Sequence, residues 1–357
     1  MGSYAYVGCY TTPDRDGRGN GINVYEMDPQ TGAWTHLKLL EGIGNPSWLT
    51  VDPSQQYLYS VHGGNDFSQV SAYAIDQSSG KLTPLGAQEC GSPNPVAISI
   101  SPIAPYAVVA GYNAGKVAAL PVNPDGSLGP MSDLVTLVGE PGPHPTEQNV
   151  SHPHHIPIDP TGQHFIVPDK GYDRTYVFRV DSASGKIVPS EQGSVMAAPG
   201  AAPRHLSFHP NARFAYQCNE INSTVTTFAY DPATGRLDEL EVQTTLPAGF
   251  SERNSTAEIH VTPSGRFVYV SNRGHNSIAI FSVDPETGTL TSVGWEPTQG
   301  RQPRYFGISP DGGLLYAANQ ATDTIVTFRV DRERGTLTPT GQVIETGSPV
   351  SIVFVDL

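Results

Sequence analysis

The sequence predicts an all-β fold, a seven-bladed β-propeller with four-stranded antiparallel blades. Three observations support this prediction. A strand–turn–strand pattern recurs along the chain, a second pair of strands follows each copy, and the two chain ends carry incomplete pieces that together make one further blade. Such a repeat decides the whole architecture, so it takes priority over local patterns.

The repeated unit begins with an apolar strand, a tight turn that contains proline, and a second apolar strand. The turn prolines recur about every 50 residues, a spacing that matches propeller blades better than helical repeats. A third strand such as TVTTFAYD or SIAIFSVD follows, then a turn such as DPATGRL, and then a fourth strand. The turn prolines are Pro53, Pro102, Pro160, Pro210, Pro263 and Pro310.

The chain ends supply the remaining blade. The C-terminal PVSIVFVDL matches a first strand, and the N-terminal part contains three strands, YAYVGCYTT, INVYEMDPQTG and AWTHLKLL. Pairing these pieces closes the ring and removes exposed sheet edges. We therefore expect residues 1–357 to form one propeller domain, since the alternative of two stacked β-sandwiches would not require a fixed period. Two long loops, 139–152 and 247–255, resemble active-site loops in length and composition.

Composition restricts the possible functions. The chain carries 34 acidic and 20 basic side chains, a net charge of −14, which disfavours binding to nucleic acid or an anionic membrane surface. Its three cysteines lack the spacing of a zinc site or a redox dithiol. The sequence has neither a long apolar run nor a signal-like start. We expect a cytoplasmic protein, a monomer or weak dimer, that needs no metal or cofactor.

The blades can be compared with one another, because a residue that the architecture requires should recur, whereas a functional residue should be singular. Two equivalent positions beside the central channel vary most. The first, at the start of the inner strand, holds Trp48, Ala97, His154, Arg204, Glu258, Arg304 and Ser351, and the second, at the end of the next strand, holds Thr11, His62, Asn113, Lys170, Glu220, Arg273 and Gln320.

The charged members of this set concentrate in blades four to seven. Sheet packing does not require them, and burying them without partners would be costly. The sequence therefore predicts a polar, net-cationic cavity at one mouth of the channel, which would bind a small anionic ligand. The alternative is a set of buried ion pairs that only join neighbouring blades.

Five segments carry a further signal: YVGCYTT, HPHHIPIDPTG, APRHLSFHPNARFAYQCNEINSTV, AEIHVTPSGRFVYVSNRGHNSI and QPRYFGISPDGGLLYAANQ. In this order, and over essentially the whole chain, they resemble the lactonase family of seven-bladed propellers. That family includes a bacterial 6-phosphogluconolactonase and the fungal carboxymuconate lactonizing enzyme. The resemblance implies a metal-free active site of one histidine, two arginines and one glutamate. By motif these are His154, Arg204, Arg273 and Glu220, which the comparison between blades also singles out.

Opening a lactone with water requires a base, a stabilised oxyanion and a proton for the leaving alkoxide. Glu220 and His154 are expected to divide the acid and base roles, while Arg204 and Arg273 bind the anionic substrate and the oxyanion. If Glu220 lies between the two arginines, its pKa is lowered, which favours His154 as the base. The residues expected to contact the substrate in addition are Lys170, Arg304, Glu258, His62 and Gln320.

The leading hypothesis is metal-independent hydrolysis of a sugar lactone, with 6-phosphoglucono-1,5-lactone as the first substrate. Two alternatives stay open: a cycloisomerase that closes the ring of carboxymuconate, and a non-enzymatic propeller scaffold. A calcium-dependent propeller lactonase would need a channel rich in carboxylates. Neither a phosphate-binding glycine loop that opens a helix nor a Gly-x-Ser-x-Gly elbow occurs. Five other histidines are expected to be structural: His152, His155, His205, His209 and His260.

Overall fold

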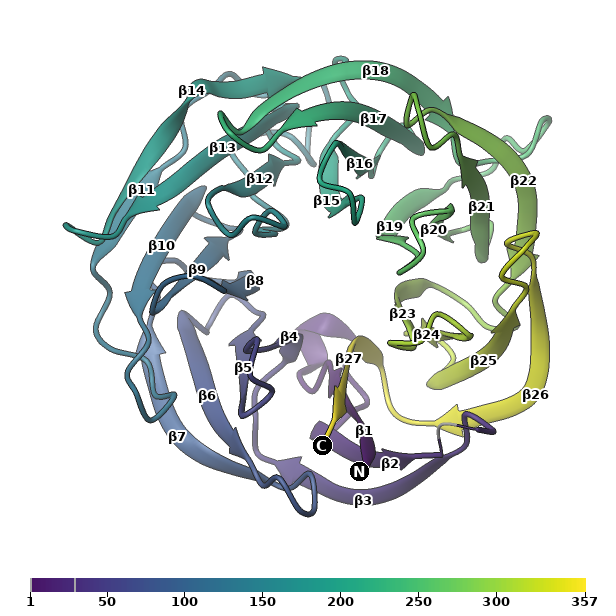
Figure 1. Ribbon diagram of the computed structural model, residues 1–357, viewed down its shortest axis with the longest axis horizontal. Helices are drawn as coiled ribbons and strands as arrows, with labels where there is room; N and C mark the ends of the chain where they lie inside the picture. The colour runs from purple at the N-terminus through teal and green to yellow at the C-terminus, as the bar shows by residue number, and fades with distance from the viewer. Residues whose placement is uncertain (1, 29) are drawn as a thin grey trace.

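The computed structural model describes residues 2–28 and 30–357. Seven antiparallel sheets stand around a common axis, and the strands of each sheet follow one another from the axis to the rim (Figure 1). Within the described residues the only helical element is the short 3-10 helix η1 (Pro13–Arg15). The predicted seven-bladed propeller is confirmed.

Blade 1 is made from both ends of the chain. The C-terminal strand lies innermost and pairs antiparallel with the N-terminal strand, with Ile352 opposite Val7. Gly2 and Leu357 exchange two backbone hydrogen bonds of 2.8 Å. The predicted ring closure is therefore confirmed. From the axis outward, the strands are β27 (Pro349–Asp356), β1 (Ser3–Cys9), β2 (Gly21–Met27) and β3 (Trp34–Glu41).

Five further blades have the same four-stranded form, and in each of them the first strand lies nearest the axis and the fourth at the rim. Blade 2 contains β4 (Pro46–Val51), β5 (Tyr57–His62), β6 (Gln69–Ile75) and β7 (Leu82–Glu89), and blade 3 contains β8 (Pro95–Ile100), β9 (Tyr106–Gly111), β10 (Lys116–Pro121) and β11 (Asp133–Thr136). Blade 5 contains β15 (Pro203–Phe208), β16 (Phe214–Asn219), β17 (Thr224–Asp231) and β18 (Arg236–Thr244). Blade 6 contains β19 (Ser255–Val261), β20 (Phe267–Arg273), β21 (Ser277–Val283) and β22 (Leu290–Pro297). Blade 7 contains β23 (Pro303–Ile308), β24 (Leu314–Asn319), β25 (Thr324–Val330) and β26 (Leu337–Glu345).

Blade 4 departs from the predicted four strands. Its inner position is filled by an irregular segment that forms only two isolated bridges, Pro153 to Asp169 and Ile158 to Phe165. Pro157 and, on the facing strand, Pro168 cannot donate a backbone hydrogen bond, so the ladder loses two donors there. The segment nevertheless brings His154 to the channel. The regular strands are β12 (Phe165–Asp169), β13 (Arg174–Asp181) and β14 (Lys186–Met196).

The core lies between blades, where the apolar faces of neighbouring sheets pack together. A repeated polar contact reinforces this packing, because a fully buried tyrosine of one blade donates its hydroxyl to a glycine carbonyl in a turn of the next. Among the described residues, the pairs are Tyr6–Gly80, Tyr59–Gly126, Tyr216–Gly288, Tyr269–Gly335 and Tyr316–Gly32. These glycines have positive φ, which explains why the turns before the fourth strands contain glycine.

Candidate active site

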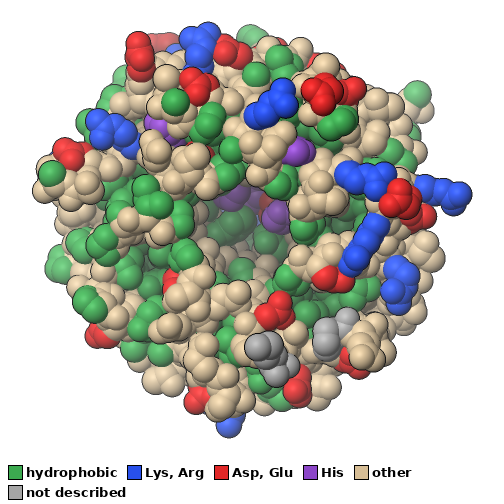
Figure 2. All heavy atoms as spheres, viewed as in Figure 1, with side chains coloured by type: hydrophobic (Ala, Val, Ile, Leu, Met, Phe, Trp, Pro, Cys, Tyr) green, Lys and Arg blue, Asp and Glu red, His purple; other side chains and the backbone are tan. Residues whose placement is uncertain are grey.

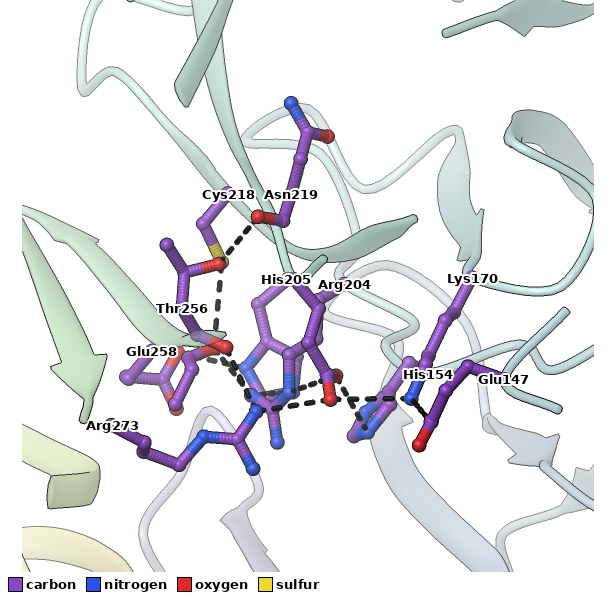
Figure 3. A network of polar contacts seen from close by, with 12 residues as sticks. Glu147, His154, Lys170, Arg204, His205, Cys218, Asn219, Thr256, Glu258 and Arg273 are labelled. Carbon is purple, nitrogen blue, oxygen red and sulfur yellow. Dashed lines mark hydrogen bonds and ion pairs between the residues drawn. The ribbon is translucent and has the colours of Figure 1, made fainter. Parts of the chain in front are cut away.

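Ionisable side chains from blades 4, 5 and 6 meet at one mouth of the channel. Arg204 lies near the start of β15, and Glu220 directly follows β16. In an antiparallel pair the start of one strand meets the end of the next, as Pro203 opposite Asn219 shows. Arg273 ends β20 in the neighbouring blade. Figure 3 shows Arg204 and Arg273 reaching the same region from separate strands.

The Glu220 carboxylate is the centre of this cluster. Its Oε2 lies 3.1 Å from Arg204 Nε, and its Oε1 lies 3.1 Å from Arg273 Nη2 and 3.2 Å from Lys170 Nζ. Burial alone would raise the pKa of Glu220, but the cations around it, Arg273 foremost, hold that pKa well below its usual range. Glu220 is therefore an anion and a weak base, and the cluster has a net positive charge.

His154 lies next to this carboxylate without a hydrogen bond to it. The imidazole Nε2 is 4.0 Å from Glu220 Oε2, and the buried Nδ1 has no hydrogen-bond partner among the described residues. The ring is held by contacts with Tyr112 and His205, with centroids 5.3 and 5.2 Å away. Burial, and then the charge of Arg204, lower the pKa of His154 well below its usual value. His154 is therefore a neutral imidazole at pH 7, and the lowered pKa makes it a weaker base than a free imidazole.

A chain of hydrogen bonds through His205 and Glu258 holds the Arg204 guanidinium in place. Arg204 Nη1 donates to the Ala257 carbonyl and, over 3.0 Å, to Nε2 of His205. Because this nitrogen accepts, the proton of the neutral His205 ring is on Nδ1, which donates to Glu258 Oε1 over 2.9 Å. The backbone N–H of Ile259 donates to the same oxygen. Burial raises the pKa of Glu258 to about 8, so it is a neutral carboxylic acid at pH 7.

An aromatic layer closes the channel beneath Arg204. The Trp48 ring lies edge-on to His155, His205 and Tyr305, with centroids 4.8, 5.3 and 5.9 Å away. The recess left between this layer and Arg204 has a volume of only about 20 Å³, which is room for about one water molecule. Along the ring axis, Figure 2 shows a central hollow with histidine side chains at its depth.

Three of the additional predicted substrate contacts lie close to the cluster. Lys170 bonds to Glu220 and, over 2.6 Å, to Glu147. Arg304 lines the recess above the aromatic layer and lies over the ring of Tyr10, 5.4 Å from its centroid. Glu258, in contrast, is 1% exposed and contacts His205, so it supports the cluster rather than facing a ligand.

The structure does not bring His62 and Gln320, the other two predicted substrate contacts, to the cluster. Both ring nitrogens of His62 are engaged within blade 2, with the Gly44 carbonyl at 2.9 Å and Ser71 Oγ at 2.7 Å. The backbone N–H of Gln320 donates a hydrogen bond to the backbone carbonyl of Gln302. As far as the described residues show, neither side chain lines the cavity that contains Glu220. His62 lies opposite Pro46, as Asn219 lies opposite Pro203, so the blade 2 counterpart of Glu220 is Gly63 and the predicted equivalence of His62 was wrong by one residue. Gln320 is a true counterpart, since Asn319 lies opposite Pro303.

Several residues of the site were not predicted from the sequence. His205 was expected to be a hydrogen-bonded core side chain, and it is buried and hydrogen-bonded, but its partners Arg204 and Glu258 were not predicted. Tyr112 stacks on His152, with centroids 4.3 Å apart, and meets His154 edge-on. Glu147 comes from the loop 139–152, so the length of that loop was the signal that pointed to it. His209, by contrast, bonds to the Gly265 carbonyl in the neighbouring turn, in keeping with the structural role expected of it.

The described ranges hold neither a cluster of metal ligands nor a membrane-spanning helix. Within residues 2–28 and 30–357, no group of three or more His, Cys, Asp or Glu side chains is arranged to hold a metal ion. None of the helical structure in that part of the chain is long and apolar enough to cross a membrane. Catalysis without a metal remains a prediction.

The closed ring and the buried arginine, glutamate and histidine cluster define a β-propeller enzyme. The chain belongs to the lactonase family of seven-bladed β-propellers, whose family model matches residues 4–354. A 6-phosphogluconolactonase of Bacillus subtilis is 36% identical over 301 residues, which cover 84% of this chain and 83% of the relative. One from Pectobacterium carotovorum is 33% identical over 287 residues, covering 80% and 81%. The structure of a periplasmic gluconolactonase of Pseudomonas aeruginosa superposes with a TM-score of 0.92 and 33% identity, covering 100% of this chain and 99% of that one.

Replacing the buried acid by its amide, Glu258→Gln, should flatten the pH dependence of stability above pH 6.5. The pKa of Glu258 is raised from 4.5 to about 8, so the native state keeps a proton that the unfolded state has lost. Stability of the wild type should therefore fall as the pH rises toward 8, by at most about 1.4 kcal/mol per pH unit. The pKa of His205 is lowered, so its effect on stability has the opposite sign. His205 reduces stability only as the pH falls below 6.5, where the unfolded state binds a proton that the native state does not.

The measurement is urea unfolding of wild type and Glu258→Gln across this range. The exposed glutamate Glu333, changed to Gln, is the matched control and should keep the wild-type slope. An identical slope in Glu258→Gln and wild type would contradict a protonated Glu258.

Proposed function

We propose that this protein is a lactonase that hydrolyses 6-phosphoglucono-1,5-lactone without a metal ion. One observation carries the proposal: a single carboxylate, Glu220, is held by Arg204, Arg273 and Lys170 directly beside the neutral imidazole of His154. Family membership and the relatives named 6-phosphogluconolactonase support the choice of reaction and of substrate.

In the proposed reaction His154 accepts a proton from water while the water oxygen attacks the lactone carbonyl carbon. The carbonyl π electrons move to oxygen and form a tetrahedral oxyanion. When this intermediate collapses, the bond from the carbonyl carbon to the ring oxygen breaks, and the ring oxygen takes the proton from His154. The product is an open-chain acid that ionises at neutral pH.

Arg204 and Arg273 have the chemistry to stabilise the oxyanion. Both guanidiniums lie 3.1 Å from Glu220, through Nε of Arg204 and Nη2 of Arg273, and Nε of Arg273 has no hydrogen-bond partner among the described residues. Such donors, held in place before the reaction, stabilise charge that develops in the transition state. Glu220 orients both guanidiniums and offsets part of their charge, a role that suits a carboxylate whose pKa is held low.

His154→Gln should lower kcat by about 100-fold, because removal of a general base typically costs 10²–10⁴-fold. KM should change little, since the arginines that hold the anion remain. Steady-state rates of acid release, corrected for uncatalysed ring opening, measure both constants. The neighbouring His152→Gln is a matched control, since its ring stacks on Tyr112, and it should lower kcat less. A His154→Gln enzyme with wild-type kcat would exclude His154 as the base.

The proposed function is tested with three substrates: 6-phosphoglucono-1,5-lactone, unphosphorylated glucono-1,5-lactone and carboxymuconate. Each is assayed with and without a chelator. We expect hydrolysis of the phosphorylated lactone at a rate that the chelator does not change. Ring closure of carboxymuconate without lactone hydrolysis would favour the cycloisomerase instead, and no turnover of any of them would overturn the proposal.

A cytoplasmic location is part of the same proposal. Cys9, Cys90 and Cys218 are free and buried, which suits a reducing compartment. Cell fractionation tests it, because the Pseudomonas aeruginosa structure is of a periplasmic protein. Light scattering tests the predicted monomer or weak dimer.

A further inference from the structure

A second cationic group lies beside the cluster, in residues that the sequence did not single out. A cavity of about 550 Å³ opens next to Glu220 and Arg273 and continues toward blades 6 and 7. This volume lies within the range typical of small-molecule sites. Its polar lining includes Glu220, Arg273, Arg253, Arg301, Asn276 and Ser255.

Two of these arginines, Arg253 and Arg301, pair with no carboxylate in the part of the chain that the structure describes. Arg204, Arg273 and Lys170 already share Glu220. Among the described residues, no carboxylate lies within ion-pair distance of Arg253 or Arg301, and neither guanidinium makes a hydrogen bond. Some exposed arginines, such as Arg18, Arg236 and Arg332, pair with carboxylates. Others, Arg179, Arg329 and Arg334, are unpaired among the described residues, so what distinguishes Arg253 and Arg301 is that they line the same cavity beside the cluster. In a chain of net charge −14, unpaired arginines that face one cavity mark a place for an anion.

The two loops that carry these arginines are fixed by hydrogen bonds. Next to Arg253, the Asn254 amide donates to Asn272 Oδ1 over 3.0 Å and accepts the backbone N–H of His275. Next to Arg301, the backbone N–H of Gln302 donates to the side chain of Asn276 over 2.8 Å. Loops anchored in this way lose little freedom when a ligand binds, which favours affinity.

We propose that Arg253 and Arg301 bind the phosphate group of the substrate and so select phosphorylated lactones over plain ones. The inference rests on the proposed function, because the cavity is continuous with the cluster through Glu220 and Arg273. With the lactone ring in the part of the cavity that Glu220 and Arg273 line, the terminal phosphate extends toward Arg253 and Arg301. A phosphomonoester dianion matches their planar donor forks and offsets both charges.

The test uses Arg253→Gln, Arg301→Gln and the double variant with both lactones. For each single variant, kcat/KM for the phosphorylated lactone should fall about tenfold or more relative to that for the plain lactone, since a hydrogen bond to a charged group carries such an effect. Arg236→Gln removes an exposed, paired arginine on β18 and is the matched control, with an unchanged ratio. An equal fall for both lactones, or an unchanged ratio, would overturn the proposal.

Binding of inorganic phosphate, measured by calorimetry, provides a readout that needs no turnover. Its Kd should rise about tenfold in each single variant and stay unchanged in Arg236→Gln. If the wild type hydrolyses neither lactone yet the variants bind phosphate more weakly, the proposed function fails and the anion site stands. If phosphate binds all variants as it binds the wild type, the anion site is excluded whatever the activity.

Discussion

Arg204→Lys is expected to lower kcat/KM for the lactone by roughly 10²- to 10³-fold, the cost typical of losing one donor to an oxyanion. Arg204 directs Nε at Glu220 and Nη1 at both the Ala257 carbonyl and His205. A lysine ammonium is a single point charge and cannot reach in these divergent directions at once. Steady-state kinetics measure the loss, and circular dichroism with thermal unfolding checks that the variant is folded.

The matched control for this substitution is Arg236→Lys. Arg236 is exposed and pairs with Asp238, so this change should leave kcat/KM at the wild-type value. A folded Arg204→Lys enzyme with activity within threefold of wild type would show that the guanidinium geometry of Arg204 does not matter for catalysis.

Glu220→Gln is expected to lower the free energy of unfolding by about 3–5 kcal/mol at pH 7, the usual cost of removing one partner from a buried ion pair. The variant leaves Arg204, Arg273 and Lys170 without the carboxylate that they share. Arg204 is the most deeply buried of the three, with a side chain that is 2% exposed. Urea unfolding of both proteins measures the difference.

Glu333→Gln is the control for that measurement. Glu333 pairs with Arg266, but its side chain is 81% exposed, and exposed pairs contribute about 0–1 kcal/mol. Should Glu220→Gln prove no less stable than Glu333→Gln, the ion pairs around Glu220 would contribute nothing to folding.

The ring could be predicted because its repeat is visible in the amino acids themselves. The turn prolines set the period, and PVSIVFVDL at the C-terminus matched the strand missing at the N-terminus. The same pattern failed at the inner position of blade 4. There Pro157 and, on the facing strand, Pro168 remove donors that a regular strand pair needs.

The convergence of Arg204, Glu220 and Arg273 could be predicted, because each is a charged side chain at one of the two repeat positions beside the channel, where blade 3 carries no charge. The role of His205 could not be, since strict alternation turns it away from its neighbour Arg204. A register shift between Pro203 and His205 breaks that alternation, so both side chains reach the same contact. Such a bulge depends on how the two strands pair, and the one-dimensional pattern does not record it.

The aromatic layer around Trp48 makes the centre of the ring a pocket that opens at one end rather than a continuous channel. With Trp48, His155 and Tyr305 packed across the axis, a lactone that enters beside Glu220 has no exit on the far side. If the lactone binds beside Glu220 as proposed, the opened acid leaves by the same opening through which the next lactone enters.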